Sequence, residues 1–270
     1  MTDTPIDHLE LNGAPVQVGE LRTLALVNYG HFTSMQVRER CVRGLDLHLE
    51  RLAQATRELF GCELDRAHAR ECLRHALGAE SRPLSARVTV FARTLDRERP
   101  LANVTPDILV SLSAASSPAV KPVRIQSFRY QRELPTIKHV GTFPLFHYRR
   151  LAQQAGFDDA LFVDADGLVA EGSTWNIGFH DGQGIVWPQA PQLAGVAMRL
   201  LQAGLVRLRV ASTTRPVRLQ DVANFSAAFL TNSNTIARPI ACIDDVDFAV
   251  DAALMAMLEQ CYETIPWEMV

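Results

Sequence analysis

The chain has 270 residues, of which 47% are hydrophobic and 21% charged, with a formal net charge of −3. This composition is ordinary for a globular protein, and a chain of this length buries enough surface to fold without a metal or disulfide staple. Acidic and basic residues are interspersed rather than gathered into a basic stripe, which argues against nucleic-acid binding.

The cysteines are scattered and form no CxxC pair, so we expect neither a disulfide framework nor a zinc site, and no other metal. They are Cys41, Cys62, Cys72, Cys242 and Cys261. The first residues are polar and acidic, and no apolar run reaches about 18 residues, so we expect no secretory signal and no membrane span. Together these features predict a cytoplasmic protein.

The first part of the chain predicts a mixture of strands and helices. Alternating or β-branched stretches predict strands over 8–13, 21–28, 32–47 with a turn near Glu39 and Arg40, 87–93, and 106–115. Apolar residues at helical spacing predict one helix from Leu49 to Phe60, ended by Gly61, and another over 65–78.

A segment rich in small residues and prolines, 113–122, is the best candidate for a linker. After it the pattern restarts, with strands expected over 123–128, 160–172, 173–188, 208–217 and 227–234, and helices over 143–156, 195–204 and 250–262. We therefore predict an α/β (α+β) protein with a smaller N-terminal α/β domain, 1–118, and a larger C-terminal domain, 119–270. A cleft between two such domains is the usual place for a ligand.

Two charged residues in the second half stand in settings that suit chemistry. Lys138 lies among Ile137, Val140 and Phe143, and a lysine in an apolar pocket can form an imine. Glu171 follows an apolar strand, where a carboxylate could pair with a buried cation such as a protonated ring nitrogen. Taken alone, Lys138 is more simply explained as a surface lysine and Glu171 as an exposed acid in a turn.

Two further stretches could bind an anion. Gly195 precedes an apolar-periodic segment, so the amides of Val196 and Ala197 would open a helix and attract a phosphate. A polar turn over 231–235 follows an apolar strand and could form an anion nest, or simply a polar loop.

In order, these features resemble the class IV (fold-type IV) PLP-dependent aminotransferases. This group includes branched-chain and D-amino acid aminotransferases and aminodeoxychorismate lyase. The matching residues are Lys138, the block from Ala160 to Gly172, Asn176-Ile177-Gly178-Phe179, Leu193-Ala194-Gly195, Thr231-Asn232-Ser233, Pro239, and His48-Leu49-Glu50-Arg51-Leu52. The resemblance covers roughly residues 28–245, and its most specific part is the block that ends in Glu171-Gly172 and continues to Asn176-Ile177.

The resemblance implies pyridoxal 5′-phosphate (PLP) as cofactor, bound in the interdomain cleft of a homodimer. Lys138 would form the Schiff base and move the proton, and Glu171 would keep the pyridine nitrogen protonated. The phosphate would be bound by Arg51, Gly195, Val196, Ala197, Ser233 and Asn234. The chain departs from the family pattern at Ala197 and Met198, at Phe143 where a Tyr is common, and at 28–31.

The resemblance favours an aminotransferase that uses a small amino acid or amine and a 2-oxo acid. The first alternative is aminodeoxychorismate lyase, supported by Ile137-Lys138-His139 and Phe32-Thr33-Ser34. The second is a catalytically silent PLP-fold binding protein, against which the joint presence of Lys138 and Glu171 argues. Candidate substrate-binding residues are Tyr29, His31, Thr33, Arg87, Arg93, Arg129, Phe143 and Trp175.

Overall fold

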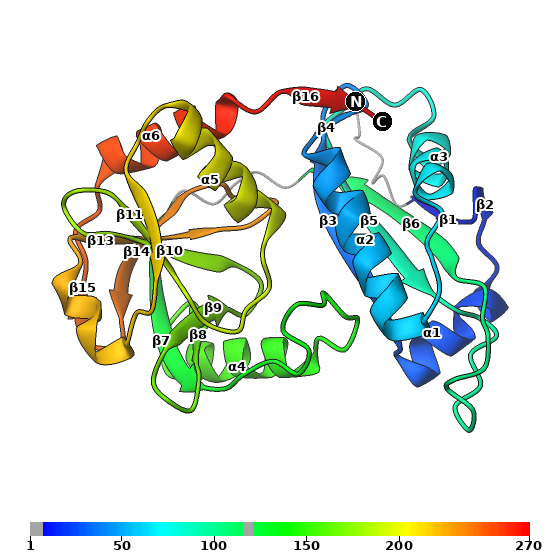
Figure 1. The fold of residues 1–270 in the computed structure, drawn as a ribbon, viewed down its shortest axis with the longest axis horizontal. Coiled ribbons are helices and arrows are strands. Elements are labelled where there is room, and N and C mark those ends of the chain that lie inside the picture. The colour runs from blue at the N-terminus through cyan, green and yellow to red at the C-terminus, as the bar shows by residue number, and fades with distance from the viewer. Residues whose placement is uncertain (1–7, 116–120) are drawn as a thin grey trace. The chain divides into compact units, whose positions relative to one another are not determined.

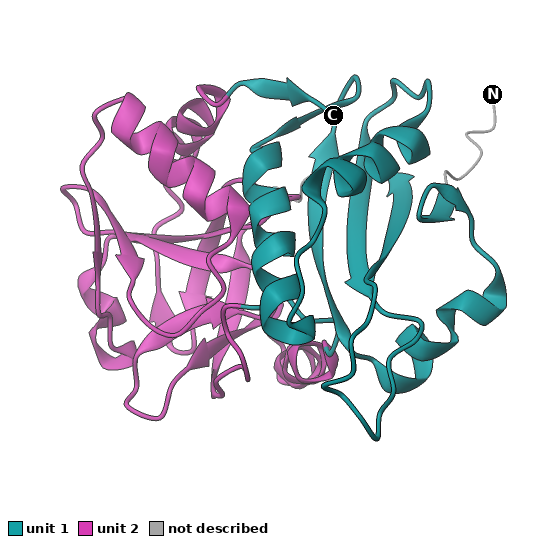
Figure 2. Ribbon diagram, turned by 45° about the vertical axis from the view of Figure 1, so that its right-hand side comes forward, with its two compact units in different colours: residues 1–117, 137–141, 266–270 teal, residues 118–136, 142–265 magenta. Residues whose placement is uncertain are grey.

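The computed structural model describes residues 8–115 and 121–270 (Figure 1). Within these ranges the chain divides into two compact units, shown in Figure 2. Unit 1 contains residues 8–115, 137–141 and 266–270, and unit 2 contains 121–136 and 142–265. The predicted boundary near residue 118 lies outside the described residues. Lys138 belongs to unit 1, in a short segment that is far along the sequence from the rest of that unit.

Unit 1 is built on a five-stranded antiparallel sheet with the order β2-β1-β6-β5-β3. Its strands are β1 (His8–Leu11), β2 (Ala14–Pro15), β3 (Gly30–Val37), β5 (Leu84–Phe91) and β6 (Asp107–Ala114). One face of this sheet is covered by α2 (Leu45–Phe60) and α3 (Arg66–Leu77), as Figure 1 shows. The predicted helices are confirmed, with α2 beginning four residues earlier than expected and ending at Gly61.

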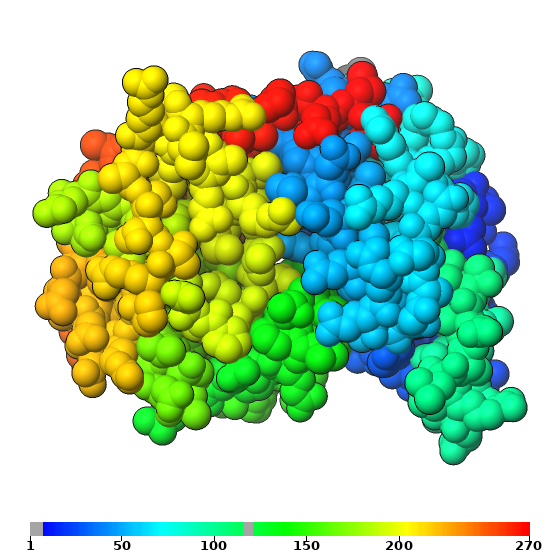
Figure 3. Space-filling view, in the orientation of Figure 1, coloured from blue at the N-terminus to red at the C-terminus, as the bar shows by residue number. Residues whose placement is uncertain are grey.

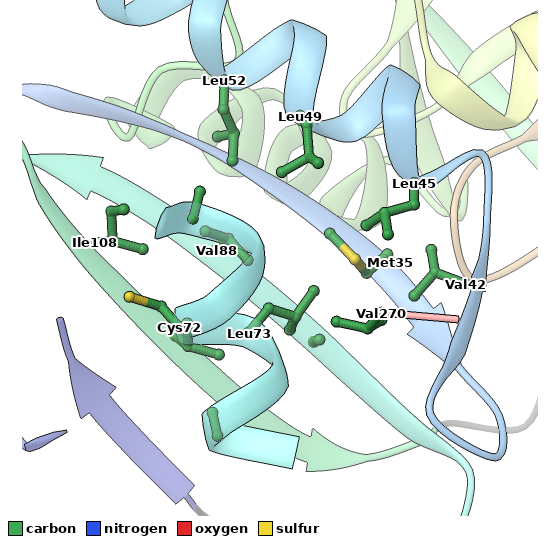
Figure 4. Packing of buried hydrophobic residues seen from close by; sticks show 14 of the residues in the cluster. Met35, Val42, Leu45, Leu49, Leu52, Cys72, Leu73, Val88, Ile108 and Val270 are labelled. Atoms are coloured by element: carbon green, nitrogen blue, oxygen red, sulfur yellow. The ribbon is translucent and has the colours of Figure 1, made fainter. Parts of the chain in front are cut away.

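The core of unit 1 forms where the two helices meet this face of the sheet (Figure 4). Met35 of β3 and Val88 of β5 point toward Leu49 and Leu52 of α2, and all four side chains are buried. Burying a side chain of this size stabilises the fold by about 1.5–3 kcal/mol. This face of β3 is therefore committed to packing, and any chemistry on this strand must use the other face.

The strand expected over 21–28 was wrong, because this segment forms the short helix α1 (Arg22–Val27) after the 3₁₀ turn η1 (Val18–Leu21). Leu21 and Leu24, three residues apart, pack on a small cluster with Phe91. The helix ends at Asn28, which takes the left-handed conformation with φ of 55°. Packing of one side on the sheet thus decides against the strand that the alternation of apolar residues suggested.

The turn expected near Glu39 and Arg40 is confirmed, since β3 reverses there into β4 (Cys41–Arg43). The final strand β16 (Trp267–Met269), which the sequence pattern missed, pairs antiparallel with β4. In Figure 3 this C-terminal segment, coloured red, lies against the blue surface of the early chain. The buried Val270 side chain joins the unit 1 core, so the end of the described chain helps to stabilise the first unit.

Unit 2 contains a large mixed sheet with the order β12-β11-β10-β13-β14-β7-β8-β9, and β15 pairs with β14. The strands are β7 (Val123–Arg129), β8 (Asp159–Val163), β9 (Val169–Gly172), β10 (Asn176–His180), β11 (Ile185–Pro188), β12 (Ser212–Arg215), β13 (Ala227–Thr231), β14 (Arg238–Ile243) and β15 (Val246–Asp247). The strands predicted in this half are confirmed, whereas β14 and β15 were not predicted.

Helices complete unit 2. They are α4 (Phe143–Gln154), α5 (Val196–Arg207), α6 (Ala252–Glu263) and the 3₁₀ helix η2 (Leu219–Asn224). Helices α5 and α6 bury apolar side chains against Trp187 and Phe229 of the sheet, while α4 packs on Ala160 and Phe162 of β8. In the part of the chain that the structure describes, no helix is long and apolar enough to cross a membrane.

A buried carboxylate clamped by two histidines supports unit 1. Glu10 on β1 accepts hydrogen bonds from His8 Nε2 and His75 Nδ1, both at 2.8 Å. Burial alone would raise the pKa of Glu10, but the bonds from His75 and His8 outweigh it, so the pKa is lowered from its ordinary value. The charged carboxylate therefore stabilises the folded state.

We predict that this clamp contributes to acid sensitivity. Because the folded-state pKa of Glu10 is lowered, its contribution is complete above the unfolded value of about 4.3 and is lost as the pH falls through the folded value. The melting temperature of Glu10→Gln should fall less steeply than that of the wild type below about pH 4.3. Glu58→Gln, on the exposed side of α2, is the control. Parallel melting curves for Glu10→Gln and the wild type would contradict this prediction.

Candidate active site

The backbone of Lys138 is held against β3 in unit 1. The amide of Phe32 donates to the Lys138 carbonyl at 2.9 Å, and the amide of Val140 donates to the Gly30 carbonyl at 2.9 Å. His139 forms an antiparallel bridge with His31 between these two bonds. The segment that carries Lys138 is thus attached to the edge of the sheet, which fixes the direction in which its side chain leaves the backbone.

The Lys138 ammonium lies on the face of β3 that the helices do not cover. Its Nζ is 5.0 Å from the centre of the Phe32 ring, within the range of a cation–π interaction. The guanidinium carbon of Arg87 on β5 lies 3.6 Å from the centre of the same ring. Two cationic groups therefore lie over the ring of Phe32. Arg87 was among the substrate-binding residues predicted from the sequence, whereas Phe32 was not.

Two predicted substrate-binding residues, His31 and Thr33, lie on the opposite face of β3. His31 Nε2 is 3.0 Å from the Thr56 hydroxyl, and Thr33 Oγ1 is 2.6 Å from His48 Nδ1. Both side chains are buried against α2. The sequence could have predicted that these two side chains face the core. Positions 31 and 33 share the strand's two-residue period with the core residues Met35 and Val37.

Two of the predicted cofactor residues, Arg51 and Lys138, act electrostatically on His48. Its pKa is lowered to about 3, first by burial and then by the positive charges of Arg51 and Lys138. Arg51 lies one helical turn after His48 on α2. Unit 1 therefore brings Arg51 and Lys138 into the electrostatic range of the same histidine, which is neutral at physiological pH and adds no charge to theirs.

The other predicted substrate contacts in this part of the chain have structural partners. The Tyr29 hydroxyl donates to the Leu59 carbonyl at 2.9 Å. Arg93 forms ion pairs with Asp107, at 3.0 Å, and with Glu20. Phe143 in unit 2 is 77% exposed and stacks on His147. Their roles toward a substrate stay predictions.

Glu171 in unit 2 is a buried carboxylate, 5% exposed, at the end of β9. Its Oε1 accepts the amide of Leu193 at 3.2 Å and lies 3.5 Å from Nη1 of Arg132. Arg132 is equally buried, at 6% exposure. The sequence-based selection missed Arg132, because a polar stretch such as Tyr130-Gln131-Arg132-Glu133 carries no local sign of burial.

The amino end of α5 lies next to the segment that contacts Glu171. Asn176, the first residue of β10, donates from its side-chain amide to the carbonyl of Leu193 at 2.8 Å and to Gln192 Oε1 at 3.0 Å. A Cβ on Gly195 would lie 2.1 Å from Asn176 Oδ1, so a larger residue there would displace the Asn176 side chain. The helix begins at Val196 as predicted, and the first amides of a helix, here those of Val196 and Ala197, have no acceptor within it.

The loop after β13 is organised by Asn232. Its Oδ1 accepts the amides of Asn234 and Thr235, both at 2.9 Å. A phosphate contact from Asn234 would therefore come from its side chain, and one from Ser233 from its hydroxyl or amide. The Thr231 hydroxyl before this loop is buried without a hydrogen-bond partner. An orphaned hydroxyl and the tight Gly195 turn fit a group rich in acceptor oxygens, such as phosphate.

Comparison with known proteins shows what the chain is similar to. The family model described as amino-transferase class IV matches residues 30–243. A probable branched-chain-amino-acid aminotransferase of Rickettsia felis is 25% identical over 158 residues, 54% of this chain. That match covers 53% of the relative, so the chain spans about half the length of the curated relative it matches.

Solved structures share the fold at low sequence identity. The branched-chain aminotransferase of Thermoproteus uzoniensis, solved with norvaline, superposes with a TM-score of 0.84 at 16% identity, covering 96% of this chain and 94% of that one. A PLP-bound hypothetical aminotransferase of Mycobacterium tuberculosis gives 0.80 at 18%, covering 96% and 98%. A fold IV transaminase of Curtobacterium pusillum gives 0.75 at 23%, covering 92% and 90%.

The buried Arg132–Glu171 pair leads to a stability prediction. Removal of one partner leaves a buried charge and costs about 3–5 kcal/mol, whereas removal of both costs less. We therefore expect Arg132→Met to lower the free energy of unfolding by about this amount, and Arg132→Met with Glu171→Met to recover part of it. Urea denaturation measures both values, with Arg129→Met, at an exposed position of β7, as the control. Additive losses in the double variant would show that the pair is not coupled.

Proposed function

The chain belongs to the class IV amino-transferase family, and we propose that it is a PLP-dependent enzyme that transfers the amino group of a small amino acid or amine to a 2-oxo acid. Relatives of the same fold support this choice of cofactor, since one was solved in a PLP-bound form and another as a complex with N-(5′-phosphopyridoxyl)-L-glutamate. Small amino acids as substrates fit the norvaline complex of the Thermoproteus enzyme.

The observation that carries the proposal is the connection between Glu171 and the start of α5. Leu193 donates its backbone amide to Glu171 and its carbonyl accepts the side-chain amide of Asn176. Two residues later Gly195 is the N-cap of α5, which begins at Val196. One short segment therefore links a buried carboxylate to a helix N-terminus. A ligand with a basic ring nitrogen and a phosphate suits these two groups.

The proposal assigns roles to the predicted site residues. PLP, when bound, withdraws electrons from the substrate carbon that bears the amine. Lys138 would hold the cofactor through its Nζ and would carry the proton between the amine-bearing carbon of the substrate and the cofactor. Glu171 keeps the ring nitrogen protonated, and Arg51 binds the phosphate with its planar guanidinium. The amides of Val196 and Ala197 and the side chains of Ser233 and Asn234 complete the phosphate contacts.

The runner-up is the lyase reaction on 4-amino-4-deoxychorismate, which begins with the same proton removal and forms 4-aminobenzoate and pyruvate. A screen of amine donors with pyruvate and 2-oxoglutarate as acceptors, run beside an aminodeoxychorismate assay, separates the two. Amino transfer requires an acceptor, whereas the lyase releases pyruvate without one. The proposal further includes a homodimer, on the family resemblance alone, and a cytoplasmic location, on the composition and scattered cysteines of the chain. Sedimentation tests the assembly.

We predict that Lys138→Ala abolishes turnover and leaves the fold intact, since Lys138 is half-buried at the edge of the sheet. Borohydride reduction of the PLP-loaded wild type should attach the cofactor to the peptide that holds Lys138, as read by mass spectrometry. The only other lysine is Lys121, which serves as the internal control. Label on Lys121 in place of Lys138 would refute the assignment.

We predict that Glu171→Gln gives a folded, PLP-loaded protein that is less stable than the wild type, because Arg132 loses its charged partner, and whose turnover is reduced about 10²- to 10⁴-fold. The amide has nearly the size of the carboxylate but no charge to hold a proton on the ring nitrogen, so the transition state rises in energy. Melting temperature, PLP occupancy and single-turnover rate are measured on one sample. A loaded variant within about threefold of the wild-type rate would exclude this role of Glu171.

A further inference from the structure

A second carboxylate in unit 2, Asp159, is surrounded by donors and lies outside the proposed cofactor contacts. Its Oδ1 accepts the Ser173 hydroxyl at 2.6 Å, the amide of Ala160 at 2.7 Å and Nε of Arg149 at 3.1 Å. Its Oδ2 accepts the indole N–H of Trp175 at 3.0 Å. Asp159 begins β8, while Ser173 and Trp175 lie between β9 and β10, so the carboxylate joins two separate parts of the sheet.

Residues 172–175, between β9 and β10, form a compact bend that Asp159 contacts. The amide of Gly172 donates to the Trp175 carbonyl at 2.8 Å, and the amide of Ser173 donates to the Ala160 carbonyl at 3.1 Å. A Cβ on Gly172 would lie 1.9 Å from the Trp175 ring, which therefore packs directly on the glycine backbone. Trp175 is 4% exposed. The predicted substrate contact Trp175 is thus placed as part of the bend itself.

Arg149 joins the helix α4 to the same bend. Its Nη2 donates to the Thr174 hydroxyl and to the Ser173 hydroxyl at 2.6 and 2.8 Å, in addition to the bond from Nε to Asp159. The Asp159–Arg149 pair therefore holds residues 173–175 from two sides. Of all the side chains in this network, only Asp159 contacts residues on both sides of the Thr174 tip.

The bend connects the two groups on which the proposed cofactor site depends. Glu171 immediately precedes it, and Asn176 immediately follows it. Asn176 in turn binds the 192–193 segment that donates to Glu171 and leads into α5. A shift of the bend therefore moves the carboxylate and the amino end of α5 together.

We propose that Asp159 is a positioning residue that sets the place of the Glu171 carboxylate relative to the start of α5, through the bend 172–175. This inference rests on the proposed function, because it assigns Asp159 to the support of the ring-nitrogen and phosphate contacts. Asp159 touches neither group, so it acts through Ser173, Trp175 and Asn176.

Asp159→Asn is the sharpest test, because it preserves size and removes one acceptor atom. Four residues donate to the two oxygens, whereas an asparagine offers one oxygen and turns N–H groups toward the remaining donors. The neighbouring Asp158→Asn makes the same chemical change at an exposed residue that accepts the amide of Arg124, and it is the matched control.

The measurements are the PLP dissociation constant of each full-length variant, the pH midpoint of the visible absorbance of bound PLP, and the melting temperature. We expect Asp159→Asn to weaken PLP binding about tenfold or more, because the bend 172–175 loses acceptor contacts. A tenfold change in the dissociation constant corresponds to about 1.4 kcal/mol. We also expect it to shift the pH midpoint in the same direction as Glu171→Gln. Asp158→Asn should match the wild type in both. A merely structural aspartate would lower the melting temperature and leave the midpoint of the loaded protein unchanged.

Ser173→Ala is the milder second variant, which keeps all charges and removes one donor to Asp159. It should shift PLP affinity and midpoint in the same direction by a smaller amount, and it decides the question if Asp159→Asn does not fold. Wild-type affinity and midpoint in the folded, loaded variants would overturn the inference. If the wild type binds no PLP, or if Glu171→Gln leaves the midpoint unchanged, the proposed function fails instead.

Discussion

The burial of the Glu171 carboxylate is the constraint on which the candidate site in unit 2 depends. A carboxylate at 5% exposure is costly unless charges and donors compensate it, and here Arg132 and the amide of Leu193 do so. The compensation brings together a loop near residue 132, the end of β9 and the segment before α5. A carboxylate that could have been left in solvent is thereby held in one place.

In unit 1 the single strand β3 contacts both the helix α2 and the segment that carries Lys138. One face of the strand holds Met35 and Val37 in the core, together with His31 and Thr33, whose polar atoms contact Thr56 and His48 of α2. Its edge holds the backbone of Lys138 by hydrogen bonds. The strand therefore positions the Lys138 segment and the helix that carries Arg51 from one rigid element.

The fold tolerates large changes in sequence, since structures at 16–23% identity superpose with TM-scores of 0.75–0.84. Hydrophobic cores accept many residues of similar volume, whereas bends such as 171–176 depend on particular donors and on a missing Cβ. This contrast explains how a short polar motif can identify the family in a chain whose core has diverged.

The family, the mixed α/β class and most helices and strands could be predicted from the sequence, because apolar periodicity and the Glu171-Gly172 to Asn176-Ile177 block are local signals. The sequence also selected Lys138, Arg51, Glu171 and Gly195 as candidates from their motif positions. Other features emerge only in the folded chain: residues 22–27 form a helix, and His31 and Thr33 face α2 while Phe32 faces Lys138. The fold also pairs Arg132 with Glu171 and brings Asp159 to the bend 172–175. These facts depend on which segments pack together over distances that no local pattern encodes. A buried ion pair or a shared hydrogen bond exists only once both partners are in place.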